Sequence, residues 1–252
     1  NDSFSDYDSY IPEQTSSSIF VPVATTQTDF QNLTHSVAAG FDSDDNGNLY
    51  SAFAGRIANE FGDLFQPAVS KSTDLGDTWS EPNVFPMSLV FSYMFQEYGV
   101  PQTDVSVGTP QGFCTYGEDQ YSFVVTVRDT NPSLSEMNRT TELVELNYDG
   151  SNWSVNRIAD ETGYIVLFVA SDGGTGNQLG REGQLVRTVD GEHLMFKWVD
   201  FAVEEQVGAE INRSNYDIFV AFKNVATGEW SEAYNLTETA DYERITWVPN
   251  MI

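Results

Sequence analysis

Short runs of alternating apolar and polar residues recur along most of the chain. They are rich in Val, Phe and Tyr, the residue types that favour β-strands. The clearest runs are LYSAFAG (49–55), YSFVVTV (121–127), TELVELNY (141–148), HLMFKWV (193–199) and YDIFVAFK (216–223). Turn-forming clusters such as DSDDNGN and TVDGE separate them. No window of helical length carries a sustained apolar stripe with the 3.6-residue period, so we expect a nearly all-β protein.

One plan of strand, turn and strand occurs three times, in AVSKSTDLGDTWSEPNVF, LVELNYDGSNWSVNRIA and FVAFKNVATGEWSEAYNL. In each copy a glycine-bearing turn is followed by Trp-Ser and a second strand. The repeated tryptophans are Trp79, Trp153 and Trp230, so the period is about 75 residues. With two earlier strands in each period, the repeat predicts four-stranded antiparallel units, which is the content of a β-propeller blade.

A resemblance to a known family rests on one stretch of the first copy. Five residues there occupy every fixed position of the Asp-box pattern, Ser-x-Asp-x-Gly-x-Thr-Trp: Ser72, Asp74, Gly76, Thr78 and Trp79. Over roughly residues 33–249 the chain therefore resembles the Asp-box (BNR-repeat) superfamily of sialidase-like β-propellers, as in secreted bacterial propeller proteins. The two later copies keep only the turn glycine, Gly150 or Gly228, and the Trp-Ser.

The resemblance implies that the Asp box is a structural hairpin between the third and fourth strands of a blade, on the side away from an active site. The chemistry of the residues agrees with this implication. Gly76 tolerates a positive φ, and the short carboxylate of Asp74 can accept backbone N–H groups across the turn. We therefore predict that the Asp box maintains the fold and binds no ligand.

The same pattern predicts how the chain is organised. We expect an N-terminal extension with one strand, then blades, then the start of a further blade, over about 1–31, 32–86, 100–160, 180–236 and 242–252. About three and a half blades would leave strand edges exposed, and exposed edges invite pairing. The chain is therefore expected to belong to a larger propeller, or to have its edges covered by a partner or by an oligomer.

The charge of the chain limits its partners. With 38 acidic and 11 basic residues the net charge is −27, which repels nucleic acids and anionic lipid surfaces. No apolar stretch approaches the roughly 20 residues needed for a membrane span. The single cysteine, Cys114, excludes an intrachain disulfide and is expected to be a small buried side chain. We expect a secreted, extracellular or cell-surface protein whose export signal has been removed.

Metal binding has one candidate in the sequence DSDDNGN. Asp42, Asp44 and Asn46 place oxygen ligands at the first, third and fifth positions of a calcium loop, and Asn48 is a further candidate ligand. The twelfth position, where a calcium loop has an acid, is Phe53. Two interpretations stay open, a weak Ca²⁺ site and a polar hairpin, so no cofactor is assigned. His35 and His193 are too isolated in the sequence to predict a zinc site.

The sequence contains several candidate catalytic residues but no spacing that connects them. The resemblance implies an enzyme with three arginines that clamp a substrate carboxylate, a tyrosine nucleophile paired with a glutamate, and an aspartate acid/base. The candidates are Arg56, Arg181, Arg187, Arg244, Tyr242 and Glu243. No spacing ties them together, and the family's Arg-Ile-Pro signature is replaced by Arg-Ile-Ala at 56–58. We therefore expect a non-catalytic module for glycan or protein recognition or for extracellular assembly. The alternative is a sialidase-like glycoside hydrolase with an incomplete or divergent active site.

Overall fold

The computed structural model describes residues 37–59, 62–108, 110–134, 138–160, 183–201, 206–207, 210–211 and 216–238. The chain divides into two compact units, residues 1–85 and 86–252, and each is considered by itself. Within the described residues the sheets are antiparallel, and one α-helix and one short 3₁₀ turn accompany them. The all-β prediction is thereby confirmed. No helix in these ranges is long and apolar enough to cross a membrane.

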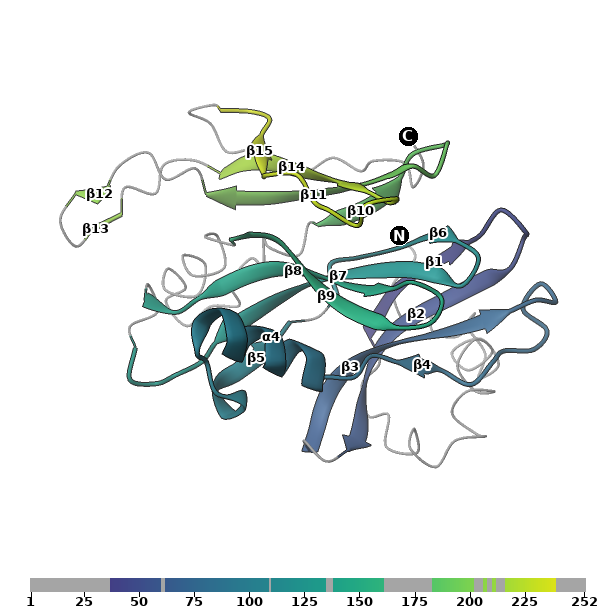
Figure 1. Ribbon diagram of the computed structural model, residues 1–252, viewed down its shortest axis with the longest axis horizontal. Coiled ribbons are helices and arrows are strands. Elements are labelled where there is room, and N and C mark those ends of the chain that lie inside the picture. Colours follow the sequence, from purple (N-terminus) through teal and green to yellow (C-terminus); the bar gives the residue numbers. More distant parts are fainter. Residues whose placement is uncertain are drawn as a thin grey trace, which may run out of the picture. The chain divides into compact units, whose positions relative to one another are not determined.

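The first unit contains one four-stranded sheet (Figure 1). Its strands follow the order β1–β2–β3–β4 and are β1 (Val37–Ser43), β2 (Leu49–Asn59), β3 (Gly62–Ser72) and β4 (Asn83–Val84). Each strand is antiparallel to the next, as expected of consecutive hairpins. The turn between β1 and β2 is the DSDDNGN sequence, and the Asp box joins β3 to β4.

The second unit begins with a five-stranded sheet. Its strands are β5 (Val105–Val107), β6 (Gly112–Gly117), β7 (Gln120–Asp129), β8 (Thr141–Tyr148) and β9 (Trp153–Asp160). Both β5 and β6 pair with β7, at opposite ends of that strand, because Val105 lies opposite Asp129 and Gly112 opposite Val124. Two short strands in succession therefore form one edge, and the sheet continues through β7 and β8 to β9.

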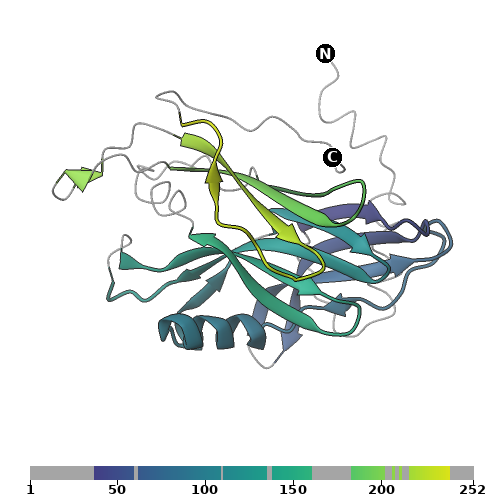
Figure 2. The same cartoon turned by 45° about the horizontal axis from the view of Figure 1, so that its top comes forward.

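The third sheet also lies in the second unit. It follows the order β10–β11–β14–β15, with strands β10 (Gln184–Arg187), β11 (His193–Phe201), β14 (Tyr216–Asn224) and β15 (Tyr234–Asn235). The short β15 forms one edge, drawn in yellow (Figure 2). The strands β12 (Gln206–Val207) and β13 (Glu210–Ile211) form a separate two-stranded hairpin between β11 and β14.

One hydrophobic core joins the two sheets of the second unit. The sheet of β5–β9 contributes Cys114, Val124, Leu143, Ile158 and Ala159, and the third sheet contributes Leu185, Leu194, Phe196, Trp198 and Ala221. Cys114 is a buried free thiol, as predicted. Strands β6 and β10 of the two sheets are close, because a Cβ added to Gly112 of β6 would lie 2.8 Å from the backbone nitrogen of Leu185 in β10. Glycine at 112 therefore permits this approach.

The sequence pattern missed one element, the helix α4 (Ser88–Tyr98). It lies against one face of the β5–β9 sheet (Figure 1), and the 3₁₀ turn η2 (Gln102–Asp104) follows it. Only Val90, Phe91 and Met94 are buried along α4, whereas Phe95 and Tyr98 are exposed, so apolar residues lie on more than one side of the helix and the sequence shows no distinct apolar stripe. The helix ends at Gly99, whose φ of 68° and N–H bond to Phe95 form a left-handed C-cap.

Candidate functional site

The residues of the Asp box form a turn with its own hydrogen-bond network. Asp74 Oδ1 accepts bonds from Ser72 Oγ at 2.8 Å and from the Thr78 backbone N–H at 2.9 Å, and Oδ2 accepts one from Thr78 Oγ1 at 2.5 Å. Gly76 has a φ of 95°. The side-chain and backbone bonds from Thr78 lower the pKa of Asp74 to about 2. The carboxylate is therefore engaged by its own turn, although it is exposed to solvent.

The three repeated hairpins share a backbone feature and differ in their tryptophan contacts. Gly150 and Gly228 have positive φ, as Gly76 does. Trp79 donates its indole N–H to the Gly76 carbonyl and lies edge-on to Phe41, 6.2 Å away between ring centroids. The other two tryptophans make different contacts. The ring of Trp153 packs with those of Tyr121, Phe123 and Tyr148, whereas the indole N–H of Trp230 donates to Glu145 Oε2. The positive-φ glycine is therefore common to the three turns. In each turn an Asp or Asn side-chain oxygen, from Asp74, Asp149 or Asn224, also accepts a backbone N–H.

The candidate calcium residues form the tight turn between β1 and β2. Asp44 is buried, and its carboxylate accepts four bonds, from Asn46 N, Asn48 N, Asn48 Nδ2 and Tyr50 OH, at 2.7–3.0 Å. Burial opposes ionisation of Asp44, but the bonds from Asn48 and Tyr50 outweigh it and lower the pKa. Asp42 accepts the Ser43 N–H at 2.9 Å. Calcium binding stays a prediction, and the ion would have to compete with these four donors for Asp44.

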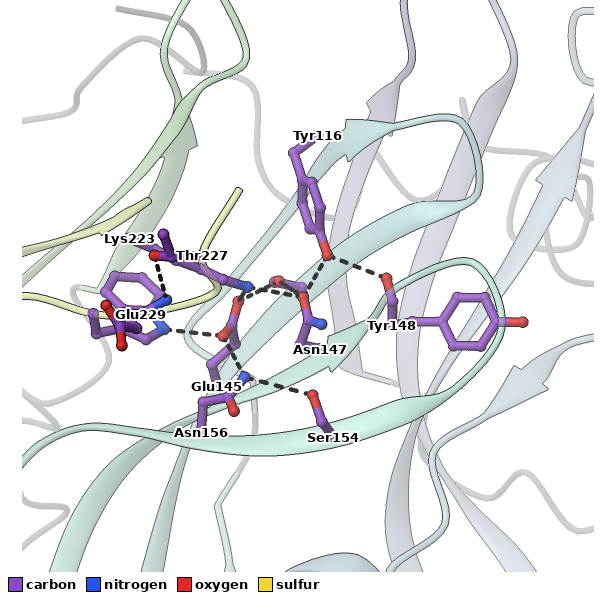
Figure 3. A network of polar contacts seen from close by, with 11 residues as sticks. Tyr116, Glu145, Asn147, Tyr148, Ser154, Asn156, Lys223, Thr227 and Glu229 are labelled. Carbon is purple, nitrogen blue, oxygen red and sulfur yellow. Dashed lines mark hydrogen bonds and ion pairs between the residues drawn. The ribbon is translucent and has the colours of Figure 1, made fainter. Parts of the chain in front are cut away.

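A buried ion pair lies between the two sheets of the second unit (Figure 3). Glu145 on β8 is fully buried, and its Oε1 lies 2.7 Å from Lys223 Nζ on β14. Ser122 Oγ also donates to Oε1, at 2.5 Å, while Asn156 Nδ2 and Trp230 Nε1 donate to Oε2 at 3.0 and 2.9 Å. An ionised carboxylate offers about four acceptor positions. Glu145 is therefore saturated by protein donors, which indicates a structural role.

The lysine of this pair has a second acceptor. Lys223 Nζ donates to Asn147 Oδ1 at 3.0 Å and lies 5.3 Å from the centroid of the Tyr116 ring. Tyr116 OH donates to the same Asn147 oxygen at 2.5 Å. Burial, followed by the charge of Glu145, raises the pKa of Tyr116. The network therefore includes strands β6, β7, β8, β9 and β14 without offering a reactive group to solvent.

A second polar cluster, which we call the Glu142 cluster, lies on the opposite face of β8. It comprises Tyr93 and Tyr98 of α4, Glu142 of β8, and Arg157 and Asp160 of β9. Glu142 and Glu145 are three residues apart, and side chains an odd number apart on a strand point to opposite faces. Tyr93 OH donates to Glu142 Oε2 at 3.0 Å, and Tyr98 OH donates to Oε1. The two tyrosines thereby fasten α4 to the sheet.

Charge in the Glu142 cluster is balanced around one arginine. Arg157 Nε lies 2.9 Å from Glu142 Oε2, and its NH2 group lies 2.7 Å from Asp160 Oδ1. The Glu142 side chain is 1% exposed, whereas those of Arg157 and Asp160 are 47% and 75% exposed. The cluster therefore runs from a buried carboxyl to solvent, and both charges of the exposed end already have partners.

The pKa values of the two carboxyl groups in the cluster, Glu142 and Asp160, are shifted in opposite directions. Burial raises the pKa of Glu142, with a further rise from Asp160, while Tyr98 and Arg157 oppose it. Burial acts against ionisation of Asp160 too, but the bond from Arg157 outweighs it and lowers the pKa. Burial also raises the pKa of both tyrosines. Such divergence is a feature of acid/base pairs in enzymes and of structural ion pairs alike.

The arginine of this cluster, Arg157, is not among the arginines proposed from the sequence. Arg187 is buried in β10, and Arg56 lies in β2. The other candidates, Arg181, Tyr242, Glu243 and Arg244, lie outside the described residues, as does His35. Arg157 was missed because nothing in the local sequence NRIAD marks it. The partners of Glu142 lie up to 49 residues away in sequence, which no spacing rule could have found.

His193 lies near two acidic side chains. From the sequence, only its separation from His35 was considered, and this group was not predicted. Ligand atoms of Asp190, Glu192 and His193 lie within 4.8 Å of one another at the turn between β10 and β11. The two acids are exposed and the histidine is half-buried. This group is separate in sequence and strand from the Glu142 cluster.

No protein-family model matches the chain, and no curated protein matches it. Among solved structures, a thermostable family-43 glycoside hydrolase aligns with a TM-score of 0.42 and 13% identity over 81% of this chain and 59% of that one. An ulvan lyase of polysaccharide lyase family PL25 aligns with a TM-score of 0.38 and 13% identity over 82% and 44%. The ulvan lyase bound to -[GlcA(1-4)Rha3S]- gives 0.37 and 13% over 82% and 44%. The chain spans less than two thirds of the length of each, and likeness at this level supports no conclusion about its chemistry.

Proposed function

We propose that the three sheets are blades of a sialidase-like β-propeller that is larger than this chain. Each sheet contains four strands that pair in sequence order, namely β1–β4, β6–β9, and β10, β11, β14 and β15, and this is the connectivity of propeller blades. The additions are β5, which also pairs with β7, and the β12–β13 hairpin inserted between β11 and β14. The close approach of β6 and β10 supports a shared axis for the two blades of the second unit. The Asp box occupies the turn between the third and fourth strands of its sheet, which supports the resemblance to Asp-box propellers.

We further propose that this propeller is a non-catalytic module that recognises a glycan or protein partner outside the cell. The observation that carries the proposal is the pairing of Arg157 with both Glu142 and Asp160. A sialidase-type site needs arginines that are available to a substrate carboxylate. The arginine beside the Tyr–Glu pair is already neutralised, so it is a poor anion clamp. The Glu142 carboxyl, almost fully buried, is held by protein donors instead of facing a substrate.

The surface beside the Glu142 cluster has the properties of a binding face. Phe95 and Tyr98 of α4 are 63% and 39% exposed. The guanidinium of Arg157 lies beside Tyr98 and is itself ion-paired with Asp160. Exposed aromatic rings next to fixed polar groups supply apolar contact and orienting hydrogen bonds together. With a net charge of −27, the protein favours partners that are neutral or positively charged.

One observation favours the alternative, a glycoside hydrolase. Glu142 has a raised pKa, Asp160 has a lowered one, and both contact the same guanidinium. Two neighbouring carboxyl groups whose environments shift their pKa values in opposite directions are a feature of the acid/base pairs of glycoside hydrolases. In that case Tyr98 and Glu142 would take part in turnover, which the binding proposal excludes.

The test of the binding proposal is a screen of the chain against an array of immobilised neutral and anionic oligosaccharides, with Phe95→Ala, Tyr98→Ala and Tyr98→Phe variants. We expect the two alanine variants to lose binding and Tyr98→Phe to retain most of it, because the ring is kept. Phe222→Ala removes another exposed aromatic ring, on β14, and is the matched control. Binding that all of these variants retain would contradict the α4 face as the binding surface.

A further inference from the structure

Three potential metal ligands gather on the hairpin between β10 and β11. They are the carboxylates of Asp190 and Glu192 and the imidazole of His193, whose ligand atoms all lie within 4.8 Å of one another. The ligand atoms of a bound ion lie closer together than this, so binding requires the two exposed acidic side chains to move towards the imidazole. The position of His193, the first residue of β11, is fixed by its pairing with Asn224 of β14.

The hairpin has a defined set of hydrogen bonds, and of the three ligand groups only Asp190 contributes a side-chain atom to it. The Thr188 N–H donates to the His193 carbonyl at 3.0 Å, and the His193 N–H donates to Thr188 Oγ1 at 3.1 Å. Gly191, with a φ of 71°, makes the turn. Asp190 Oδ1 accepts bonds from Thr188 Oγ1 and from the Glu192 N–H, which leaves Oδ2 for another partner. The three side chains are therefore presented by a defined turn.

Two of the three ligand groups have no other role in the described part of the chain. There, neither the Glu192 carboxylate nor the His193 ring has a hydrogen-bond partner; these residues bond through their backbones. An imidazole nitrogen distinguishes this group from an ordinary acidic patch, because nitrogen is a ligand that Zn²⁺, Ni²⁺ and Cu²⁺ prefer and that Ca²⁺ and Mg²⁺ do not. Three protein ligands would leave coordination positions for water.

We propose that Asp190, Glu192 and His193 form a binding site for a divalent transition-metal ion, with Zn²⁺ as the natural first candidate. Two carboxylates neutralise the charge of the ion, and the imidazole sets its preference. Imidazole and thiol donors are few in the sequence, because it contains only two histidines, His35 and His193, and one cysteine, Cys114, which is buried. A few substitutions are therefore enough to show which residue supplies a nitrogen ligand to the ion.

The test is a calorimetric titration of the full chain with Zn²⁺, repeated in an excess of Mg²⁺ and then of Ca²⁺. We expect one Zn²⁺ site that neither competing ion displaces. Loss of a metal ligand should weaken binding by at least about tenfold, because even the residues that support a ligand contribute 10–100-fold to metal affinity. The variants His193→Ala, Asp190→Asn and Glu192→Gln should each show this loss, and His35→Ala should not. Asp190→Asn keeps an oxygen acceptor for the turn, so the hairpin is preserved.

A matched control lies on the hairpin between β8 and β9. Asp149 Oδ1 accepts the N–H groups of Ser151 and Asn152, and Gly150 makes that turn with a φ of 95°, but no histidine is present. Asp149→Asn should leave Zn²⁺ binding unchanged. A readout without mutation is the NMR spectrum of the chain with ¹⁵N-labelled histidine, in which Zn²⁺ should shift the His193 ring signals and spare those of His35. Absence of Zn²⁺ binding, equal binding by His193→Ala, or displacement by Mg²⁺ or Ca²⁺ would overturn the proposal.

Discussion

Lys223 Nζ lies 2.7 Å from Glu145 Oε1, and both side chains are almost completely buried. The two residues are 78 positions apart in sequence, so their contact joins separate sheets of the second unit. Isolated charges are costly to bury, and here each charge is compensated by the other and by neighbouring donors and acceptors. The pair therefore depends on the correct docking of the two sheets.

Removal of one partner should destabilise the protein strongly. We predict that Lys223→Met lowers the free energy of unfolding by about 3–5 kcal/mol, because it leaves the Glu145 carboxylate buried without its counter-charge. The measurement is chemical denaturation of the variant and the parent. The double variant Lys223→Met/Glu145→Gln should recover part of this loss, since no uncompensated charge remains. Strictly additive effects of the two substitutions would show that the pair is not coupled.

The Asp box should confer a specific pH dependence. The pKa of Asp74 falls from 3.8 to about 2 on folding, so its contribution is fully present above about pH 4 and is lost as the pH falls towards 2. We predict that Asp74→Ala lowers the melting temperature at neutral pH. We also predict that the difference between the parent and Asp74→Asn shrinks between pH 4 and pH 2. A difference that stays constant across this range would show that the charge of Asp74 does not stabilise the turn.

Calcium binding at the turn between β1 and β2 can be separated from the structural role of Asp44. Site binding stabilises by RT ln(1 + [L]/Kd), about 2.7 kcal/mol at a hundredfold excess of ion over Kd, whereas screening acts on all exposed charges. We predict that Ca²⁺ raises the melting temperature more than Mg²⁺ or NaCl of equal ionic strength. The Asp42→Asn/Asp44→Asn variant should lose this selective gain and should be less stable in every salt, because Asp44 accepts four bonds within its turn. Equal effects of the three salts on the parent would leave the turn with a structural role only.

The sequence predicted strands and turns, which depend on neighbouring residues, but it did not predict contacts between residues that are distant in the chain. Alternating residues predicted β2, β7, β8, β11 and β14, and the turn glycines at 76, 150 and 228 have the positive φ that hairpins need. The helix α4 was missed because its apolar residues are not confined to the buried side, as the exposed Phe95 and Tyr98 show. Tyr98 and Glu142 are 44 positions apart, and each is unremarkable in its own segment. Such pairs arise from the packing of a helix on a sheet, which a period or a motif does not encode.

The most direct test of the account is an assay of the chain for release of a fluorophore from sialoside and other aryl glycoside substrates. We predict no turnover, because Glu142 is buried and Arg157 is already paired with two carboxylates. Tyr98→Phe removes the hydroxyl that donates to Glu142 and keeps the ring, and Tyr242→Phe tests the pair proposed from sequence. Turnover by the parent that either substitution abolishes would contradict the account and establish a glycoside hydrolase.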